Sequence, residues 1–223
     1  MLLRERVYHE LKKDVLSGAF RMGERLLVGD LAEQHGVSKT PVREALSILQ
    51  QEGLVRIVPR VGYFVAHMTV EEVQNLFQLR LIVEGASAEL AAQHITEPEL
   101  LQLEQIPCSW VVGDMDSYLK YLADNRRFHF RVAKATRNSH LADLVGNLLD
   151  KTQGLLLWEL QLRNRPEEFA DEHGQLVVAL RNHDGVLAQR VMHEAIERTR
   201  QALLQAVLSG MRLPIASESS VRD

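Results

Sequence analysis

The stretch LAEQHGVSKTPVREALSILQQEGLVRIVPRVGYFVA, residues 31–66, decides the fold of the first part of the chain. It predicts a short helix, a turn, a second helix and a two-stranded ribbon, which together form a winged helix-turn-helix. Gly36 stands at the turn between the helices, where the backbone needs a residue that tolerates positive φ. Ser38 or Thr40 can cap the second helix with a hydroxyl, and Gly53 fits just past its last turn.

The second helix of this stretch has an apolar face and a polar face. Four apolar residues follow the spacing i, i+3, i+4 and i+7, which places them toward the core: Val42, Ala45, Leu46 and Leu49. The other face presents Lys39, Thr40, Arg43 and Ser47. The wing is expected as strands over residues 54–57 and 63–65, with Arg60 at the tip between them. A solvated surface is one interpretation of the polar face, but the order of turn, helix and wing favours DNA binding through base edges.

The string GVSKTPVREALSILQQEGLV, residues 36–55, resembles the signature of the GntR-type bacterial transcription regulators. The wing ending RVGYFV, residues 60–65, is similar to the basic, glycine-containing wing of that family. The resemblance implies six operator contacts, four from the helix and two from the wing: Lys39, Thr40, Pro41, Arg43, Arg60 and Gly62. The chain departs from the fatty-acid-responsive branch at Gly29, ahead of Asp30, where an arginine supplies a further contact in that branch.

Length and charge agree with a regulator of two domains. The chain of 223 residues is long enough for one small and one medium domain. Residues 1–67 hold ten lysines and arginines against eight acidic residues, and the remainder holds 16 against 22, consistent with the net charge of −4. The positive excess in the first part is small. Operator affinity should therefore depend on where the charges lie and on doubling of the site by dimerisation, more than on bulk charge.

The sequence also indicates the compartment. It contains no run of about 18 apolar residues, and MLLRERVYHELKK at the N-terminus predicts an amphipathic helix rather than a secretory signal. The protein is expected to be cytoplasmic and to bind no membrane. The single cysteine, Cys108, excludes an intramolecular disulfide, and a buried small apolar role is favoured over redox sensing.

The rest of the chain has an almost entirely helical pattern. A first helix is expected over residues 4–17, and a short hinge at 67–69 separates a DNA-binding domain, 1–67, from an all-helical domain, 68–213. Pro107 should kink or split the third helix of the second domain. Residues 214–223 are expected to be a disordered tail. The expected helices of the second domain are 70–77, 78–94, 97–112, 115–136, 139–163, 167–182 and 185–210.

Three segments of the helical part resemble the FCD ligand-binding domain of the fatty-acid-regulator branch. They are LRLIVEGASAELAA at 79–92, NRRFHFRVAKATRN at 125–138 and DEHGQLVVALRNHDGVLAQRVMHEAI at 171–196. Arg80 and Glu84 stand in family positions of the first segment. The resemblance implies a mainly α protein, in which a winged helix-turn-helix with a small β wing precedes an all-α bundle that binds an effector and dimerises.

Many members of that branch bind a divalent metal in the bundle, and the resemblance implies an incomplete set of ligands here. Asn125 and His129 are i and i+4 on one helix face, so an oxygen and an imidazole can converge on one ion. His173 matches the third ligand. The fourth is expected 22 residues later, where this chain has Ala195. His193 lies nearby, but two residues back on a helix turn a side chain by about 200°, toward the opposite face.

Three interpretations of these residues stay open. In the first, His129 and His173 are interior histidines that line an effector pocket without metal. In the second, Asn125, His129 and His173 hold Zn²⁺ or Ni²⁺ weakly, with water or effector oxygens completing the coordination. In the third, a shifted final helix lets His193 or His183 reach the ion.

The effector is expected to be a small organic acid. By resemblance Arg80 supplies the cation for its carboxylate, whereas Arg126 and Arg127 more often serve at the surface. Tyr121 and Trp158 can wall the pocket, although aromatic residues at helical spacing more often belong to the core. The expected effector-binding set is Arg80, Asn125, His129 and His173.

Together these features predict a homodimeric, ligand-responsive transcription regulator that is not an enzyme. It is expected to be a repressor that binds a palindromic operator in double-stranded DNA. A dimer with two-fold symmetry is matched by a DNA site with the same symmetry. One alternative is a metal-dependent hydrolase, but nothing beyond two histidines indicates that apparatus. The other, a sequence-neutral architectural DNA binder, is disfavoured by the acidic second domain.

Overall fold

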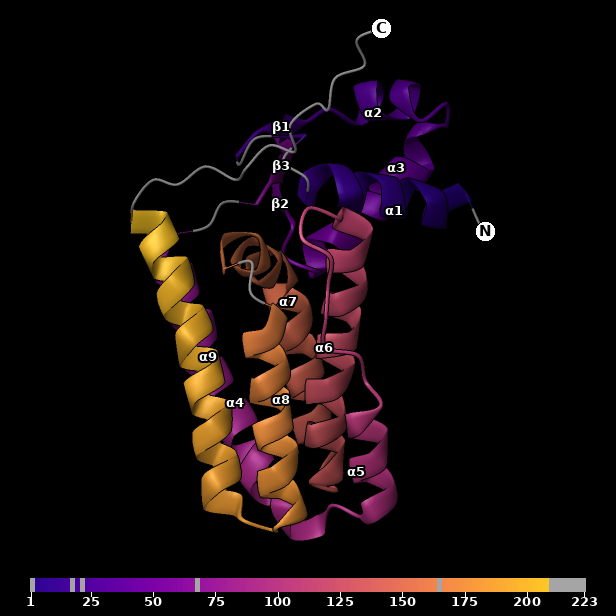
Figure 1. Cartoon of the computed structure of the whole chain (residues 1–223). Helices are drawn as coiled ribbons and strands as arrows, with labels where there is room; N and C mark the ends of the chain where they lie inside the picture. The colour runs from indigo at the N-terminus through magenta and orange to yellow at the C-terminus, as the bar shows by residue number, and fades with distance from the viewer. Residues whose placement is uncertain (1–2, 17–18, 21–22, 67–68, 164–165, 209–223) are drawn as a thin grey trace, which may run out of the picture. The chain divides into compact units, whose positions relative to one another are not determined.

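The computed structural model describes residues 3–16, 19–20, 23–66, 69–163 and 166–208 (Figure 1). The chain divides into two compact units, the first made mainly of Met1–Met68 and the second of Thr69–Asp150 with Leu155–Gly210. Residues 67–68 of the hinge predicted at 67–69 lie outside the described residues, as do the predicted tail at 214–223 and the expected end of the first helix at Ser17.

Three helices form the core of the first unit: α1 (Leu3–Leu16), α2 (Val28–Gln34) and α3 (Lys39–Gln51). Helix α1 packs on α3, and their apolar faces are fully buried at positions that include Val7, Leu11, Val42, Leu46 and Leu49. The two turn positions are confirmed, because Gly36 has φ of 63° after α2 and Gly53 has φ of 72° after α3. The predicted hydroxyl cap is wrong. Ser38 occupies the N-cap position, but its side chain makes no hydrogen bond to the helix.

A three-stranded antiparallel sheet forms the wing, where the sequence predicted two strands. Strands β2 (Val55–Val58) and β3 (Gly62–Val65) pair as a hairpin with Ile57 opposite Tyr63. The additional strand β1 (Arg25–Leu26) pairs with the other edge of β3, so the order is β1-β3-β2. A strand of two residues shows no alternation of apolar and polar side chains, which explains why the sequence pattern did not indicate it.

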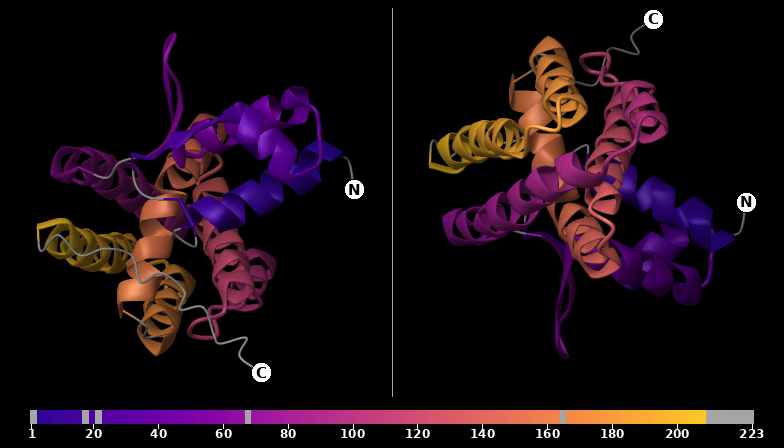
Figure 2. Two further views of the ribbon diagram at one scale, coloured as in Figure 1. Left: turned by 90° about the horizontal axis from the view of Figure 1, so that it is seen from above. Right: turned by 90° about the horizontal axis from the view of Figure 1, so that it is seen from below.

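The second unit is a bundle of long helices (Figures 1 and 2). Helix α4 packs along α9, and α8 also contacts α9, while α6 lies against α4. No helix in the described part of the chain is long and apolar enough to cross a membrane. The helices of this unit are α4 (Val70–His94), α5 (Glu97–Glu104), α6 (Met115–Ala135), α7 (Ser139–Arg163), α8 (Pro166–Arg181) and α9 (Gly185–Leu208).

Helix α4 is one continuous helix, so the predicted break between residues 77 and 78 is wrong. No glycine, proline or capping residue stands at that point, and buried positions continue through it from Phe77 to Arg80 and Glu84. The start of the helix is fixed by a capping box. Thr69 Oγ1 accepts from Glu72 N at 3.1 Å, and Glu72 Oε2 accepts from Thr69 N at 3.1 Å.

Helix α5 ends at Glu104, eight residues earlier than predicted. Pro107 has no N–H to donate and disfavours helical geometry at Ile106, so the helix stops before it instead of kinking. Residues 105–114 form a loop that leads to α6, whose N-cap Asp114 accepts from Ser117 N at 3.2 Å. The loop brings Trp110 into the bundle, where it is buried.

Candidate functional site

The polar face of α3 is exposed in the described structure. Lys39, Thr40 and Arg43 are exposed in the first turns of α3, while Pro41 is half-buried beside them. Burial of Val42 and the other apolar residues of α3 fixes this orientation. Side chains with hydrogen-bond donors thus gather at the N-terminal end of the helix, which is where a recognition helix contacts base edges and phosphates.

The tip of the wing is an exposed turn that carries a cation. Arg60 is exposed with φ of 63°, and Gly62 has φ of 137°, a conformation that favours glycine. Arg25 on β1 supports this turn, because its Nη2 donates to the carbonyl of Val61 at 2.6 Å. Sequence reasoning missed Arg25, since its place beside the wing depends on the two-residue strand β1.

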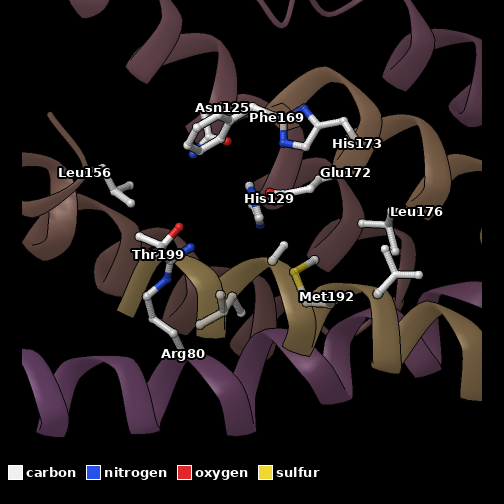
Figure 3. A pocket seen from close by; sticks show the side chains of 13 residues that line it. Arg80, Asn125, His129, Leu156, Phe169, Glu172, His173, Leu176, Met192 and Thr199 are labelled. Atoms are coloured by element: carbon white, nitrogen blue, oxygen red, sulfur yellow. The ribbon is translucent and has the colours of Figure 1, made fainter. Parts of the chain in front are cut away.

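A cavity lies within the helical bundle (Figure 3), with an empty volume of about 440 Å³ when its opening to solvent is included. Helices α4, α6, α7, α8 and α9 contribute side chains to it. Its apolar wall includes Leu156, Phe169, Leu176, Val191, Met192, Ala195 and Ile196. Its polar residues are Arg80, Asn125, His129, Glu172, His173 and Thr199.

A buried chain of charges runs along one side of the cavity. Arg80 Nε donates to Glu84 Oε1 at 2.6 Å, and the two side chains are 3% and 1% exposed. The other carboxylate oxygen of Glu84 lies 2.7 Å from Nδ1 of His129. Burial by itself raises the pKa of Glu84, but the charges of Arg80 and His129 outweigh that effect and lower it to about 2. Glu84 is therefore ionised at neutral pH.

His173 occupies the facing side of the cavity. Its ring stacks on Phe128 with centroids 3.8 Å apart and planes at 7°, and the ring of His129 is 5.6 Å away. Burial lowers the pKa of His173 well below its usual value, and the nearby His129 lowers it further. The imidazole is therefore neutral at pH 7. Next to it, Glu172 accepts a hydrogen bond from Arg198 Nε at 2.8 Å.

Apart from Nδ1 of His129, which lies 2.7 Å from Glu84, two buried polar atoms of the cavity residues have no hydrogen-bond partner among the described residues. They are Nη1 of Arg80 and Nδ1 of His173. A buried donor without a partner is costly in a folded protein, and a cavity that contains one is a good place for a ligand atom. Arg80 is therefore the clearest indication of ligand chemistry in this unit.

The structure places Ala195 in the cavity, together with Asn125, His129 and His173. His193, in contrast, points at α4, and its Nε2 donates to the carbonyl of Leu81 at 2.8 Å. The alternative of a shifted final helix is therefore wrong for His193, whose ring fills the space left by the missing side chain of Gly85. His183 is likewise engaged elsewhere, with Nδ1 2.7 Å from the carbonyl of Ala92.

The donor set at the cavity does not fit a resident divalent metal ion. Within the described residues, no three side chains of His, Cys, Asp or Glu are placed to hold one. Asn125 offers a neutral amide oxygen, which lies 3.5 Å from the hydroxyl of Tyr121, and position 195 offers a methyl group. The unpartnered cationic Nη1 of Arg80 further disfavours a metal cation.

The other expected residues surround the site without forming it. Tyr121 is buried and packs on Trp110, with ring centroids 4.7 Å apart, and both approach Phe169 of the cavity wall. Sequence reasoning missed Trp110, because the early end of α5 determines its position. The side chain of Trp158 lies outside the described residues.

The remaining arginine and cysteine candidates have partners or surroundings that explain them. Arg126 pairs with Asp150, and Arg127 lies 2.7 Å from Asp124, so neither is among the cavity-lining residues. Burial raises the pKa of Cys108 to about 11, which keeps the thiol protonated and unreactive. This agrees with the expectation of a structural role.

Comparison with protein families matches both units. The model described as "Bacterial regulatory proteins, gntR family" matches residues 3–65, and the FCD domain matches residues 75–198. The chain belongs to the GntR family of bacterial transcription regulators. The cavity thus lies in the FCD domain of a GntR-family protein, and the α3 surface lies in its DNA-binding domain.

Curated relatives of this GntR-family chain are transcription regulators. It is 27% identical over 206 residues to the HTH-type transcriptional regulator YdhC of Bacillus subtilis, covering 91% of this chain and 84% of that one. It is 25% identical over 224 residues to the gluconate operon transcriptional repressor of the same organism, with coverage of 96% and 90%. The HTH-type transcriptional repressor RspR of Escherichia coli is 26% identical over 207 residues, with coverage of 91% and 90%.

Solved structures share the fold. Escherichia coli McbR/YncC superposes with a TM-score of 0.67 at 23% identity, covering 93% of this chain and 99% of that one. A GntR regulator from Rhodococcus has a TM-score of 0.66 at 20% identity, with coverage of 91% and 98%. These similarities concern the fold alone.

Proposed function

We propose that this GntR-family regulator is a homodimeric repressor that binds a palindromic operator and responds to a small carboxylate in the FCD cavity. The observation that carries the effector part is the buried Nη1 of Arg80, which has no partner among the described residues. A carboxylate oxygen is the natural acceptor for such a donor, because an ionic hydrogen bond is about twice as strong as a neutral one. As a regulator of chromosomal DNA, the protein would act in the cytoplasm.

The proposed DNA contacts come from two exposed places in the first unit. Lys39, Thr40 and Arg43 with Pro41 lie at the start of α3, and Arg60 with Gly62 lies at the wing tip. The helix can donate to base edges and the wing to the phosphate backbone. Because the first unit has only a small positive excess, a single copy would bind weakly. Two copies on a symmetric site would add their contacts.

The carboxylate assignment also agrees with the rest of the cavity. Polar groups from α6, α8 and α9, namely Asn125, His173 and Thr199, face the same space as Arg80 and can hydrogen-bond to a polar acid. One relative is named for repression of a gluconate operon, and gluconate is a small carboxylate. The effector would act through different affinities for the DNA-binding and released arrangements of the dimer.

The test begins with selection of an operator from random duplexes by the full-length protein. We expect a two-fold symmetric sequence, a dimer in sedimentation, and release of the operator by at least one acid among acetate, lactate, citrate and gluconate. Arg127→Gln serves as the matched control for Arg80→Gln, because Arg127 is paired at the surface. Release should persist in Arg127→Gln and disappear in Arg80→Gln. A monomer, or a selected site without symmetry, would contradict the proposal.

A further inference from the structure

We infer that the FCD cavity of this chain binds its carboxylate without a metal ion, with Arg80 supplying the positive charge and His129 and His173 bonding directly to ligand oxygens. This inference rests on the proposed function, because it specifies how the same cavity recognises its acid. It differs from the expectation of a weakened metal site, which assigned Asn125, His129 and His173 to an ion.

The carboxylates near the cavity are already paired with basic side chains, which disfavours their binding to a metal. Glu84 is held by Arg80 at 2.6 Å and by His129 at 2.7 Å. Glu172 accepts from Arg198 at 2.8 Å. A divalent cation would therefore meet two imidazoles and an amide, with no free anionic ligand to offset its dehydration.

The charge of Arg80 has the sign that an anion requires. The guanidinium is buried, its Nε binds Glu84, and its Nη1 has no partner in the described part of the chain. At short range in a protein interior, this charge repels a divalent cation and attracts a carboxylate. Figure 3 shows Arg80 entering the cavity from α4, on the side opposite His173.

The two imidazoles are held in place without a metal. Phe128 fixes the plane of His173 by stacking at 3.8 Å, and Nδ1 of His173 remains without a partner among the described atoms. Nδ1 of His129 faces Glu84, which leaves Nε2 of that ring for the cavity. A ligand that bonds to Arg80 and to both rings would satisfy the buried polar atoms that the fold leaves open.

Ala195 gives the ligand room where a fourth metal ligand would stand. Its methyl group, with Val191 and Met192, forms an apolar wall along α9. The carbon skeleton of a small acid can pack there while its carboxylate faces Arg80. An imidazole at position 195 would occupy this space and supply a third nitrogen, so one substitution should move the site from anion binding toward metal binding.

The first experiment titrates Ni²⁺ by calorimetry into chelator-treated, full-length protein. We expect no saturable binding at micromolar concentration in the wild type, and binding at least about 100-fold tighter in Asn125→Asp/Ala195→His, because each restores a direct ligand. The matched control is Arg190→His, which adds an imidazole at an exposed site of α9. It should behave as the wild type does. Wild-type binding as tight as that of the double variant would overturn the inference.

The second experiment measures thermal stabilisation of the same protein by acetate, lactate, citrate and gluconate, with and without EDTA. A ligand that binds only the folded state raises Tm, and the rise grows with the ratio of its concentration to its Kd. We expect the rise to be unchanged by EDTA and lost in Arg80→Gln/Glu84→Gln, which removes both partners of the buried pair and so avoids an isolated charge. Loss of the rise in EDTA, or no rise with any of the acids, would overturn the inference.

Operator binding separates this inference from the proposed function. Acids that stabilise the protein in EDTA but never release the operator would support the metal-free site and contradict the proposed regulation. Acids that release the operator only after Ni²⁺ is added would support the regulation and overturn the metal-free site.

Discussion

The recognition helix and the FCD cavity use similar side chains in opposite surroundings. On α3, Lys39 and Arg43 are exposed. On α4, Arg80 and Glu84 are buried and bonded to each other. Charges of the first kind are available to an external partner and contribute little to folding, whereas charges of the second kind are part of the fold. Substitutions should therefore separate binding from stability in the first region and couple them in the second.

The largest difference between the regions should come from removing one member of the buried pair. We expect Glu84→Ala to lower the free energy of unfolding by about 3–5 kcal/mol, because Arg80 is left buried without its anion. Arg43→Ala should change it by less than about 0.5 kcal/mol. Urea denaturation followed by circular dichroism measures both. The double variant Arg80→Met/Glu84→Leu should recover much of the loss, and equal small effects at Glu84 and Arg43 would break the comparison.

The reverse holds for DNA binding. We expect Arg43→Ala to weaken operator binding by about 1–3 kcal/mol with little effect on a scrambled duplex, because it removes contacts to particular bases. Arg60→Ala in the wing should weaken both duplexes alike, since phosphate contacts carry no sequence information. Arg190→Ala, at an exposed site of α9, is the control. Equal, small losses on both duplexes for Arg43→Ala would remove it from the set of base contacts.

Glycine-to-alanine substitutions sharpen the comparison at the level of packing. At Gly85 an added Cβ would lie 2.0 Å from Nε2 of His193, so we expect Gly85→Ala to destabilise by about 1–3 kcal/mol. At Gly29 in α2 an added Cβ meets nothing within 4 Å, and alanine should stabilise the helix by about 0.5–1 kcal/mol. Thermal unfolding distinguishes the two signs. His193→Ala should relieve much of the Gly85→Ala effect, and failure to do so would place the strain elsewhere.

The smallest effect is expected from an exposed ion pair of the second unit. A hydrogen bond from Arg137 lowers the pKa of Glu99 to about 2, despite partial burial that raises it. Because the folded pKa lies below the ordinary value of 4.5, the stabilisation is present above pH 4.5 and is lost as the pH falls toward 2. We expect Glu99→Gln to lower Tm slightly at pH 7 and not at pH 2. An equal decrease at both values would show that the charge is irrelevant.

The winged helix-turn-helix was predictable because its signals are local. Helix faces, turn glycines and the hairpin are encoded within a few residues of each other. The two-residue strand β1 was not predictable, because its pairing with Phe64 and Tyr63 depends on the folded wing. In the helical part, the pattern predicted the helices but placed a false break within α4 and extended α5 past Pro107.

The cavity was predictable in its positions and less so in its chemistry. Resemblance and spacing selected Arg80, His129 and Ala195, which the structure brings together. Their roles remain predictions. The partners that change the chemistry come from separate elements, as Arg198 does for Glu172, and sequence spacing does not indicate such pairs. The exception is Glu84, whose i, i+4 relation to Arg80 is an ordinary sequence signal for a helical ion pair.

Three described residues other than glycine have a positive φ: Arg60, Arg137 and His183, at 63°, 63° and 53°. Such a conformation costs an ordinary side chain about 1–3 kcal/mol and persists only where surrounding contacts hold it. In two of the three, the side chain itself makes such contacts. Arg137 pairs with Glu99 and donates to the carbonyl of His94, and His183 bonds to the carbonyl of Ala92.

At the wing tip, the side chain of Arg60 makes no such bond to any described residue. Glycine would adopt this backbone conformation with less strain, so the interior of the fold gives no reason for arginine at this position. A chain optimised only for its own stability would not keep a strained residue here. The backbone of the turn is held within the chain, because Val61 N donates to the carbonyl of Val58 at 3.0 Å. The fold thus accepts a small conformational cost at the wing tip while the side chain of Arg60 points to no partner of its own, as expected of a residue kept for binding rather than for stability.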